Sequence, residues 1–248
     1  MPLHPYLQDK LLFRPSRLPE DYRFRFDAPF EEHFIDTPDQ VRLNALFFPA
    51  HRRQSKGVVL YFHGNRGHLQ RWGAEHVRFN EQGYDFFAVD YRGYGKSSGA
   101  PSASHWYADA LLVLEHLLHG YAPQQIVLYG RSLGSAAATR LAAEGRARTL
   151  VLETPFDNIR NLFQSYVPMR RLPIEPAFEF PNDEHLRRTQ MPVLIFHGTR
   201  DRVVPYHSAA GLKPLLKPGD RFVTIEGGAH HNLGAFQHFQ EHLSDWLK

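Results

Sequence analysis

The sequence of 248 residues contains no cysteine. Disulfide bonds, thiolate metal sites and a cysteine nucleophile are therefore excluded together. The chain also lacks an apolar run close to the roughly 20 residues that a membrane-spanning helix needs. The best stretch of this kind, residues 108–121, is shorter and contains Glu115 and His116. We therefore predict no integral membrane segment.

The chain also has little concentration of charge of one sign. Its 29 Lys and Arg residues stand against 26 Asp and Glu residues, a formal net charge of +3, and they are scattered along the sequence. Proteins that bind nucleic acid usually carry basic residues clustered on one face. Residues 1–19 show no signal-peptide pattern, because prolines and charged residues interrupt them. We predict a cytoplasmic protein with no nucleic-acid partner.

Short apolar runs rich in β-branched and aromatic residues recur along the chain. They are residues 57–64, 84–93, 125–132, 149–155, 192–201 and 221–228. Runs without polar alternation are typical of strands buried on both faces. Segments with helical periodicity, such as 103–121 and 135–145, lie between them and predict parallel βαβ crossovers. We predict a single α/β domain with a mostly parallel central sheet and helices on both faces.

Three segments fall outside this rhythm. Residues 1–30 form a lead-in rich in proline and arginine, and residues 31–50 read as a hairpin around the turn signal Thr37-Pro38-Asp39. Residues 156–191 hold four prolines and many aromatic residues between two predicted strands. They form either a plain irregular connection or a lid, because long connections in α/β domains are often lids or binding loops. We favour the lid.

The segment Gly130-Arg131-Ser132-Leu133-Gly134 fits the pattern G-x-S-x-G. A predicted strand precedes it and a predicted helix follows, which is the context in which such a serine acts as a nucleophile. The alternative is a structural turn with a small residue. A serine hydroxyl needs a base to take its proton, so the hypothesis requires a histidine and an acid elsewhere in the chain.

Candidates for the base and the acid lie in loops that follow later strands. His230 and His231 come after the last predicted strand, and Asp201 follows the strand before it. The chain order serine, aspartate, histidine is the order of α/β-hydrolase triads. The residues alone do not choose between the two adjacent histidines.

Other titratable residues compete with these candidates. Asp157 and Glu153 follow another strand and are rival acids, with Asp157 the stronger rival, whereas Asp90 is better interpreted as organising a glycine turn. His238 and His242 are four residues apart on a predicted helix, a spacing that can bind zinc. The H-E-x-x-H order is absent, so we interpret this pair as part of a solvated helix face and predict no metal and no cofactor.

An oxyanion hole needs backbone N–H groups aimed at the oxygen that becomes negative. One donor is expected at Leu133, the residue after the nucleophile. The other is expected in the loop His63-Gly64-Asn65, which follows the first buried strand, and we assign it to Asn65. Catalytic Ser132 and Asp201, one of the two histidines and the amides of Leu133 and Asn65 complete the predicted site.

Taken together, the motifs YFHGNRG, VDYRGYGKSSG, YGRSLGSAAA, PVLIFHGTRDRVVP and EGGAHHNL resemble those of the α/β-hydrolase superfamily in order and spacing. Within it, the sequence is similar to a compact-lid branch of serine hydrolases that includes depalmitoylating thioesterases and uncharacterised bacterial relatives. The resemblance aligns His230 with the catalytic histidine of that branch. His231 and Asn232 stand where the branch usually has Asn and Asp.

The sequence therefore predicts a serine hydrolase that cleaves carboxylic esters or thioesters through an acyl-serine intermediate. Its partner would be a small-molecule or lipid-like acyl substrate, and the aromatic residues Phe156, Phe163, Tyr166 and Phe178 of the predicted lid favour an apolar acyl pocket. A serine peptidase on the same fold is the alternative, since fold does not fix substrate. A non-catalytic binding module is a weaker alternative, because no member of the triad is missing.

Overall fold

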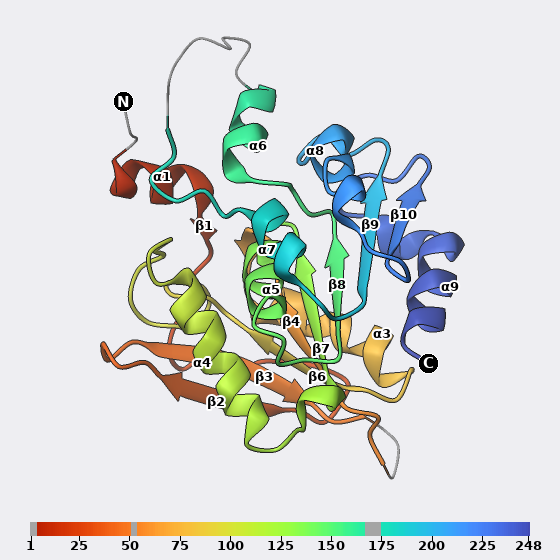
Figure 1. The fold of residues 1–248 in the computed structure, drawn as a ribbon. Helices are drawn as coiled ribbons and strands as arrows, with labels where there is room; N and C mark the ends of the chain where they lie inside the picture. The colour runs from red at the N-terminus through yellow and green to blue at the C-terminus, as the bar shows by residue number, and fades with distance from the viewer. Residues whose placement is uncertain (1–3, 51–53, 167–174) are drawn as a thin grey trace.

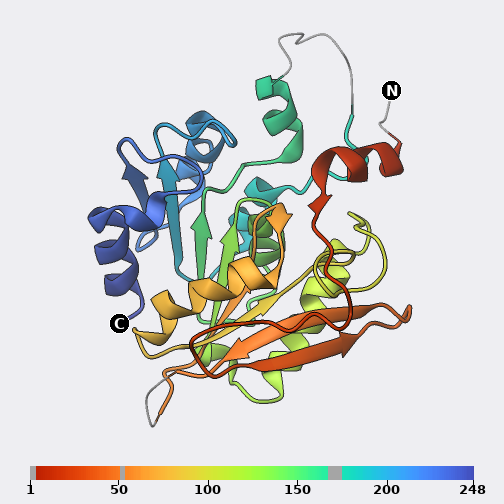
Figure 2. The same ribbon diagram turned by 180° about the vertical axis from the view of Figure 1, so that it is seen from behind.

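A twisted sheet of eight strands runs through the protein, with helices in front of it and behind it (Figures 1 and 2). The computed structural model describes residues 4–50, 54–166 and 175–248. The spatial order of the strands is β10-β9-β8-β7-β4-β6-β3-β2. In this sheet only β3 runs antiparallel to its neighbours, β2 and β6, and every other pair is parallel. The mostly parallel α/β sheet predicted from the sequence is therefore confirmed.

The strands of this sheet are β2 (Glu31–Asp36), β3 (Arg42–Phe48), β4 (Val58–Phe62), β6 (Asp85–Val89), β7 (Ile126–Arg131), β8 (Thr149–Glu153), β9 (Val193–Gly198) and β10 (Arg221–Ile225). A separate two-stranded parallel sheet pairs β1 (Arg14–Pro15) with β5 (Arg66–Gly67). The helices are α1 (Pro5–Leu12), α2 (Leu69–Trp72), α3 (His76–Asn80), α4 (Trp106–Leu118), α5 (Gly134–Ala142), α6 (Ile159–Tyr166), α7 (Asn182–Arg188), α8 (Tyr206–Ala210) and α9 (Gln237–Trp246).

Each face of the sheet carries its own hydrophobic core. Successive side chains of a strand point to opposite faces, and in β4 residues Val58, Leu60 and Phe62 join the core under α4, α5 and α7. Val59 and Tyr61 join the core under α2, α3 and α9. Both sets are fully buried or nearly so. This explains why the parallel strands show apolar runs without polar alternation.

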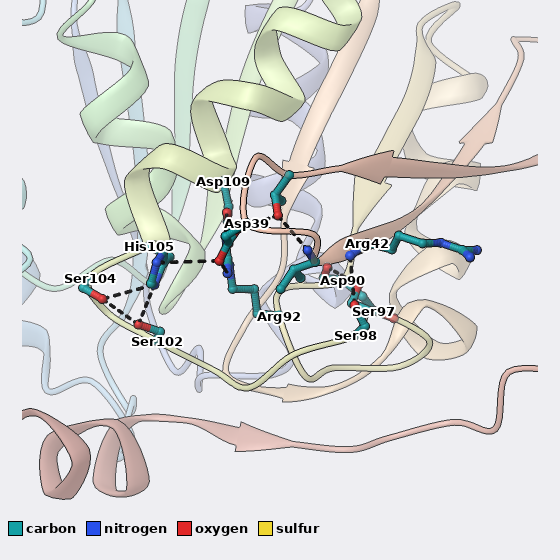
Figure 3. A network of polar contacts seen from close by, with 12 residues as sticks. Asp39, Arg42, Asp90, Arg92, Ser97, Ser98, Ser102, Ser104, His105 and Asp109 are labelled. Atoms are coloured by element: carbon teal, nitrogen blue, oxygen red, sulfur yellow. Dashed lines mark hydrogen bonds and ion pairs between the residues drawn. The ribbon is translucent and has the colours of Figure 1, made fainter.

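A polar network fixes the turns at one end of the sheet (Figure 3). The guanidinium of Arg92 bridges two carboxylates, with Nη2 2.9 Å from an oxygen of Asp39 and 2.7 Å from an oxygen of Asp109. It thereby ties the β2–β3 turn to the beginning of α4. Nearby, the Ser97 hydroxyl donates to the carbonyl oxygen of Asp90 at 2.7 Å. The network holds the turn after β6 in place.

The carboxyl ends of β4, β7, β9 and β10 lie at one edge of the sheet, because these strands are parallel. In open α/β sheets, ligands bind outside this edge. The loops that carry the predicted catalytic residues all begin there. The fold therefore brings together segments that lie far apart in the sequence.

Candidate active site

Ser132 lies on the sharp turn between β7 and α5 with a φ of +51°, a left-handed conformation that non-glycine residues rarely adopt. The turn is tight enough to require glycine on both sides. A Cβ at Gly130 would lie 2.7 Å from the Gly134 carbonyl oxygen, and a Cβ at Gly134 would lie 2.0 Å from the Phe62 carbonyl oxygen. The two glycines of the motif thus let the chain turn sharply and place the serine at the carboxyl end of β7.

Ser132, His230 and Asp201 form one hydrogen-bonded chain. His230 Nε2 is 2.9 Å from Ser132 Oγ, and His230 Nδ1 is 2.7 Å from Asp201 Oδ2. The other Asp201 oxygen accepts the backbone N–H groups of Val203 and Val204, both at 2.8 Å. The structure therefore brings the three predicted residues together.

The surroundings of Asp201 favour its ionised form. Burial opposes the charge on Asp201, but the hydrogen bond from His230, the His230 charge and the Val204 amide outweigh it and lower the pKa of Asp201 below its usual value. An Nδ1–H held by a carboxylate leaves Nε2 free to accept a proton from the serine. The arrangement can therefore perform general-base chemistry at Ser132 Oγ.

The rival acids are engaged elsewhere. The Asp157 carboxylate accepts hydrogen bonds from the Ser208 hydroxyl and the Asn161 amide, both at 2.6 Å. Glu153 accepts the Tyr129 hydroxyl at 2.6 Å. Asp90 Oδ1 lies 3.1 Å from His63 Nε2 and organises the turn after β6. Each of these carboxylates has a structural set of partners.

His231 packs beside the other histidine and not against the serine. Its ring centroid is 4.8 Å from that of His230 at a nearly perpendicular angle. Burial, together with the charges of His230, Arg131 and Arg71, lowers the pKa of His231. The ring that contacts Ser132 is that of His230.

The predicted oxyanion donors flank the serine from two loops. Among the described residues, neither the Leu133 N–H nor the Asn65 N–H donates to an acceptor within the protein, so both are available to a substrate oxygen. Hydrogen bonds from Tyr94 and Arg14 hold Asn65 in place. The Tyr94 hydroxyl donates to its carbonyl oxygen at 2.9 Å, and the Arg14 N–H donates to its side-chain oxygen at 2.9 Å.

A cavity of about 430 Å³ opens above Ser132, a size within the usual range for small-molecule sites. Its apolar lining consists of Leu12, Trp72, Leu133, Phe156, Ile159, Leu162, Val203 and Val204. Its cationic lining consists of Arg14, Arg66, Arg71 and Arg131, and within the described residues no carboxylate side chain lines it. One part of the cavity is thus suited to hydrocarbon and another to negative charge.

The segment predicted to be a lid contributes to this cavity in part. Phe156 and two aliphatic residues of α6, Ile159 and Leu162, line it. Of the four aromatic residues expected at the acyl pocket, Phe163, Tyr166 and Phe178 do not belong to the lining. The apolar surface is therefore mainly aliphatic. Residues 167–174 of this segment lie outside the described residues.

The N-terminal lead-in forms part of the site, which the sequence did not indicate. Leu12 and Arg14 line the cavity, and β1 pairs with β5 directly after Asn65. The buried Gln8 side chain attaches α1 to the segment that follows α6, because it donates to the Phe178 carbonyl oxygen at 2.6 Å. The sequence offered no periodicity in this segment from which the pairing was predictable.

Arg131, the variable residue of the G-x-S-x-G motif, also has a defined place. It is buried, and its Nη1 lies 3.3 Å from Glu75 and 3.4 Å from Glu153. Its Nη2 donates to the His230 carbonyl oxygen at 3.3 Å. Arg131 therefore ties the histidine loop to the centre of the sheet. A charged residue beside the nucleophile, followed by a glutamate at the end of the next strand, is the signal that was available in the sequence.

Among the described residues, no third side chain suited to bind a metal joins the histidine pair on α9. The rings of His238 and His242 pack with centroids 4.5 Å apart, and the described part of the chain contains no group of three or more residues suited to hold a metal ion. Within the same described residues, no helix is both long and apolar enough to cross a membrane.

An eight-stranded, mostly parallel sheet with a serine on a sharp strand-to-helix turn defines the class of α/β hydrolases. Comparison with known proteins agrees. A family model described as "Serine aminopeptidase, S33" matches residues 53–174. Protein bem46 of Schizosaccharomyces pombe is 30% identical over 215 residues, which cover 81% of this chain and 72% of that protein. The chain belongs to the α/β-hydrolase superfamily and is an enzyme of the hydrolase class.

Two further similarities place the chain within this group. Alpha/beta hydrolase domain-containing protein 17B of Xenopus laevis is 27% identical over 197 residues, covering 78% of this chain and 67% of that protein. The solved structure of the esterase Pf2001 of Pyrococcus furiosus superposes with a TM-score of 0.73 at 19% identity, covering 94% of this chain and 97% of that one. The superposition shows a shared fold.

Proposed function

We propose that this protein is a serine hydrolase that cleaves carboxylic esters or thioesters through an acyl-Ser132 intermediate. The observation that supports this most directly is the hydrogen-bonded chain from Ser132 Oγ through His230 to Asp201, at 2.9 and 2.7 Å. Distances of this kind are those at which a base can take a nucleophile's proton. Ser132 and His230 line a cavity large enough for a small substrate.

In the first half of the reaction, Ser132 Oγ attacks the acyl carbonyl carbon while His230 Nε2 takes the hydroxyl proton. The carbonyl oxygen becomes negative and accepts the N–H groups of Leu133 and Asn65. The bond between the acyl carbon and the leaving oxygen or sulfur then breaks, and the imidazolium gives its proton to that leaving atom. Asp201 stabilises the imidazolium throughout.

In the second half, a water molecule replaces the leaving group. His230 takes a proton from the water as its oxygen attacks the acyl-serine carbonyl carbon. The same two amides stabilise the second tetrahedral intermediate, and its collapse returns the proton to Ser132 Oγ. The products are a carboxylic acid and free enzyme. Loss of one oxyanion donor typically costs about 3 kcal/mol of transition-state stabilisation.

The charge of the cavity favours this reaction over that of an aminopeptidase, the activity in the name of the matching family model. An aminopeptidase must hold the cationic α-amino group of its substrate, which a carboxylate does best. Here the described lining offers Arg14, Arg66 and Arg71 and no carboxylate. Repulsion between these guanidinium groups and an ammonium group would weaken the binding of such a substrate.

Two measurements on one variant test the proposal. Ser132→Ala is expected to abolish turnover of nitrophenyl esters and labelling by a serine-directed phosphonate. The matched control, Ser104→Ala, alters an exposed serine near α4 that bonds Ser102 and His105, and it should keep both. Undiminished turnover in Ser132→Ala would refute the proposal. A wild-type protein that neither turns over esters nor takes the label would favour a binding module instead.

The acyl preference is tested separately. With nitrophenyl esters from acetate to palmitate, kcat/KM is expected to rise with chain length as the acyl group covers the apolar lining, because each buried methylene contributes about 0.8 kcal/mol. A matched panel of aminoacyl anilides tests the peptidase alternative. Higher kcat/KM for the anilides than for every ester would contradict the assignment as an esterase or thioesterase.

A further inference from the structure

We propose that the substrate carries a phosphate on its leaving group, which Arg14, Arg66 and Arg71 bind while the acyl chain occupies the apolar lining. This inference rests on the function proposed above and assigns the class of substrate for the same site. The phosphate is not transferred: water still cleaves the ester or thioester bond, and the leaving alcohol or thiol departs with its phosphate intact.

The first support is that these three arginines have no counter-charge. In the described part of the chain, none of them has a carboxylate oxygen within 4.0 Å, and all three are exposed to the cavity and solvent. The residues outside that part, 1–3, 51–53 and 167–174, contain no Asp or Glu. By contrast, the Arg92 and Arg131 guanidinium groups each contact two carboxylates.

The second support is the register of the two-stranded sheet. Arg14 of β1 stands directly opposite Arg66 of β5. Like charges directly opposite each other on paired strands destabilise the pair. An anion held between them would remove the repulsion, and a phosphate accepts several N–H groups from guanidinium forks.

The third support is that the Arg71 side chain is positioned by its contact with Trp72. Its guanidinium carbon lies 4.7 Å from the centroid of the Trp72 ring, as in a cation–π contact. The Trp72 indole in turn donates to the Arg66 carbonyl oxygen at 2.8 Å. Gly67 leaves room for the Arg71 stem, because a Cβ there would lie 3.3 Å from Arg71 Cδ. The position of Arg71 is thus coupled to β5.

The position of the charge relative to the base assigns it to the leaving group. Arg71 lines the cavity together with His230 and His231. In the proposed reaction, His230 is the group that protonates the leaving atom. The acyl chain is left with the apolar residues of α6 and of the loops after β8 and β9. Both views show α1 and α6 beyond the same edge of the sheet (Figures 1 and 2).

Phosphate-bearing leaving groups occur in nucleotide thiols and in lipid head groups, and paired substrates distinguish these sources. The thioester pair is octanoyl-coenzyme A and octanoyl-pantetheine, which share the thioester and the acyl chain. The oxyester pair is a lysophosphatidic acid and the monoacylglycerol with the same chain. We expect kcat/KM of the phosphate-bearing member to exceed that of its neutral partner by about tenfold or more in at least one pair. Because salt screens exposed charges, the preference should fall as ionic strength rises.

Variants then locate the preference. Arg66→Gln and Arg71→Gln should each lower the ratio of kcat/KM between the two members of the favoured pair by about fivefold or more. Arg23→Gln removes an exposed arginine that does not line the cavity, and it should keep the wild-type ratio. Equal kcat/KM for both members of both pairs, or ratios unchanged in Arg66→Gln and Arg71→Gln, would overturn the proposal.

The outcomes separate this inference from the function on which it rests. If nitrophenyl esters are cleaved and Ser132 is labelled but neither pair shows a preference, the phosphate assignment fails and the serine hydrolase stands. If the enzyme prefers esters of dicarboxylic acids to both phosphate-bearing substrates, the cationic lining serves the acyl side and the proposal is wrong. If wild-type protein shows neither turnover nor labelling, both proposals fail.

Discussion

The arginines around the cavity are of two kinds. Arg131 is buried, contacts Glu75 and Glu153, and donates to the backbone of His230. Arg66 and Arg71 are exposed and have no carboxylate partner among the described residues. A buried charge without a partner is strongly destabilising, whereas an exposed one is tolerated. The first kind therefore serves the fold, and the second kind is available to a ligand.

The largest expected effect is a loss of activity on substitution of Asp201, whose carboxylate contacts His230. Asp201→Asn should leave the fold intact but lower kcat for nitrophenyl esters by about 10⁴-fold, because the amide no longer holds the tautomer of His230 or its positive charge. Steady-state kinetics would show it.

The matched control for this change is Asp157→Asn, since the Asp157 carboxylate accepts hydrogen bonds from Ser208 and Asn161 and lies outside the cavity lining. It should change kcat by no more than a few-fold. A loss in Asp157→Asn as large as that in Asp201→Asn would contradict the assignment of the acid.

The next effect is on stability. Arg131→Met leaves the buried Glu153 without its main counter-charge, so the free energy of unfolding should fall by about 3–5 kcal/mol in denaturant titrations. Adding Glu153→Gln should restore part of the loss. Arg71→Gln, the unpaired counterpart, should change it by less than about 0.5 kcal/mol. Equal losses in the two arginine variants would remove the distinction between them.

The buried His185, which has no carboxylate partner among the described residues, should make the stability of the protein depend on pH. Burial, together with the charges of Arg140 and Arg188, lowers the pKa of His185 to about 4. The unfolded chain therefore binds this proton first, and stability should fall as pH drops from about 6.5 to about 4, by up to about 3 kcal/mol. Denaturant titrations across this range should show a shallower slope in His185→Gln, with exposed His119→Gln as the control. An unchanged slope in His185→Gln would be evidence against a neutral His185.

The smallest expected effect lies in the two-stranded sheet. Arg66→Gln removes the repulsion with Arg14, so the unliganded protein should gain up to about 0.5 kcal/mol in the free energy of unfolding at low salt. The gain should vanish at high salt, because salt screens exposed charges. A loss of stability at low salt would show that Arg66 serves the fold.

The sequence was sufficient to predict the sheet because Val58–Phe62 and its counterparts are apolar on both faces. The meeting of Ser132, Asp201 and His230 was predictable because each follows a strand in a loop with glycines or a turn signal. The contacts of Arg131 with Glu75 and of β1 with β5 were not. They depend on the packing of distant segments, and no local periodicity encodes such contacts.

The pairing of β1 with β5 joins residues 14 and 66, and the bond between His230 and Ser132 joins residues 98 positions apart. Contacts between residues so distant in sequence form late in folding, because long loops must close first. Catalytic activity is therefore a reporter of complete folding. During refolding, the recovery of turnover should trail the recovery of helical circular dichroism.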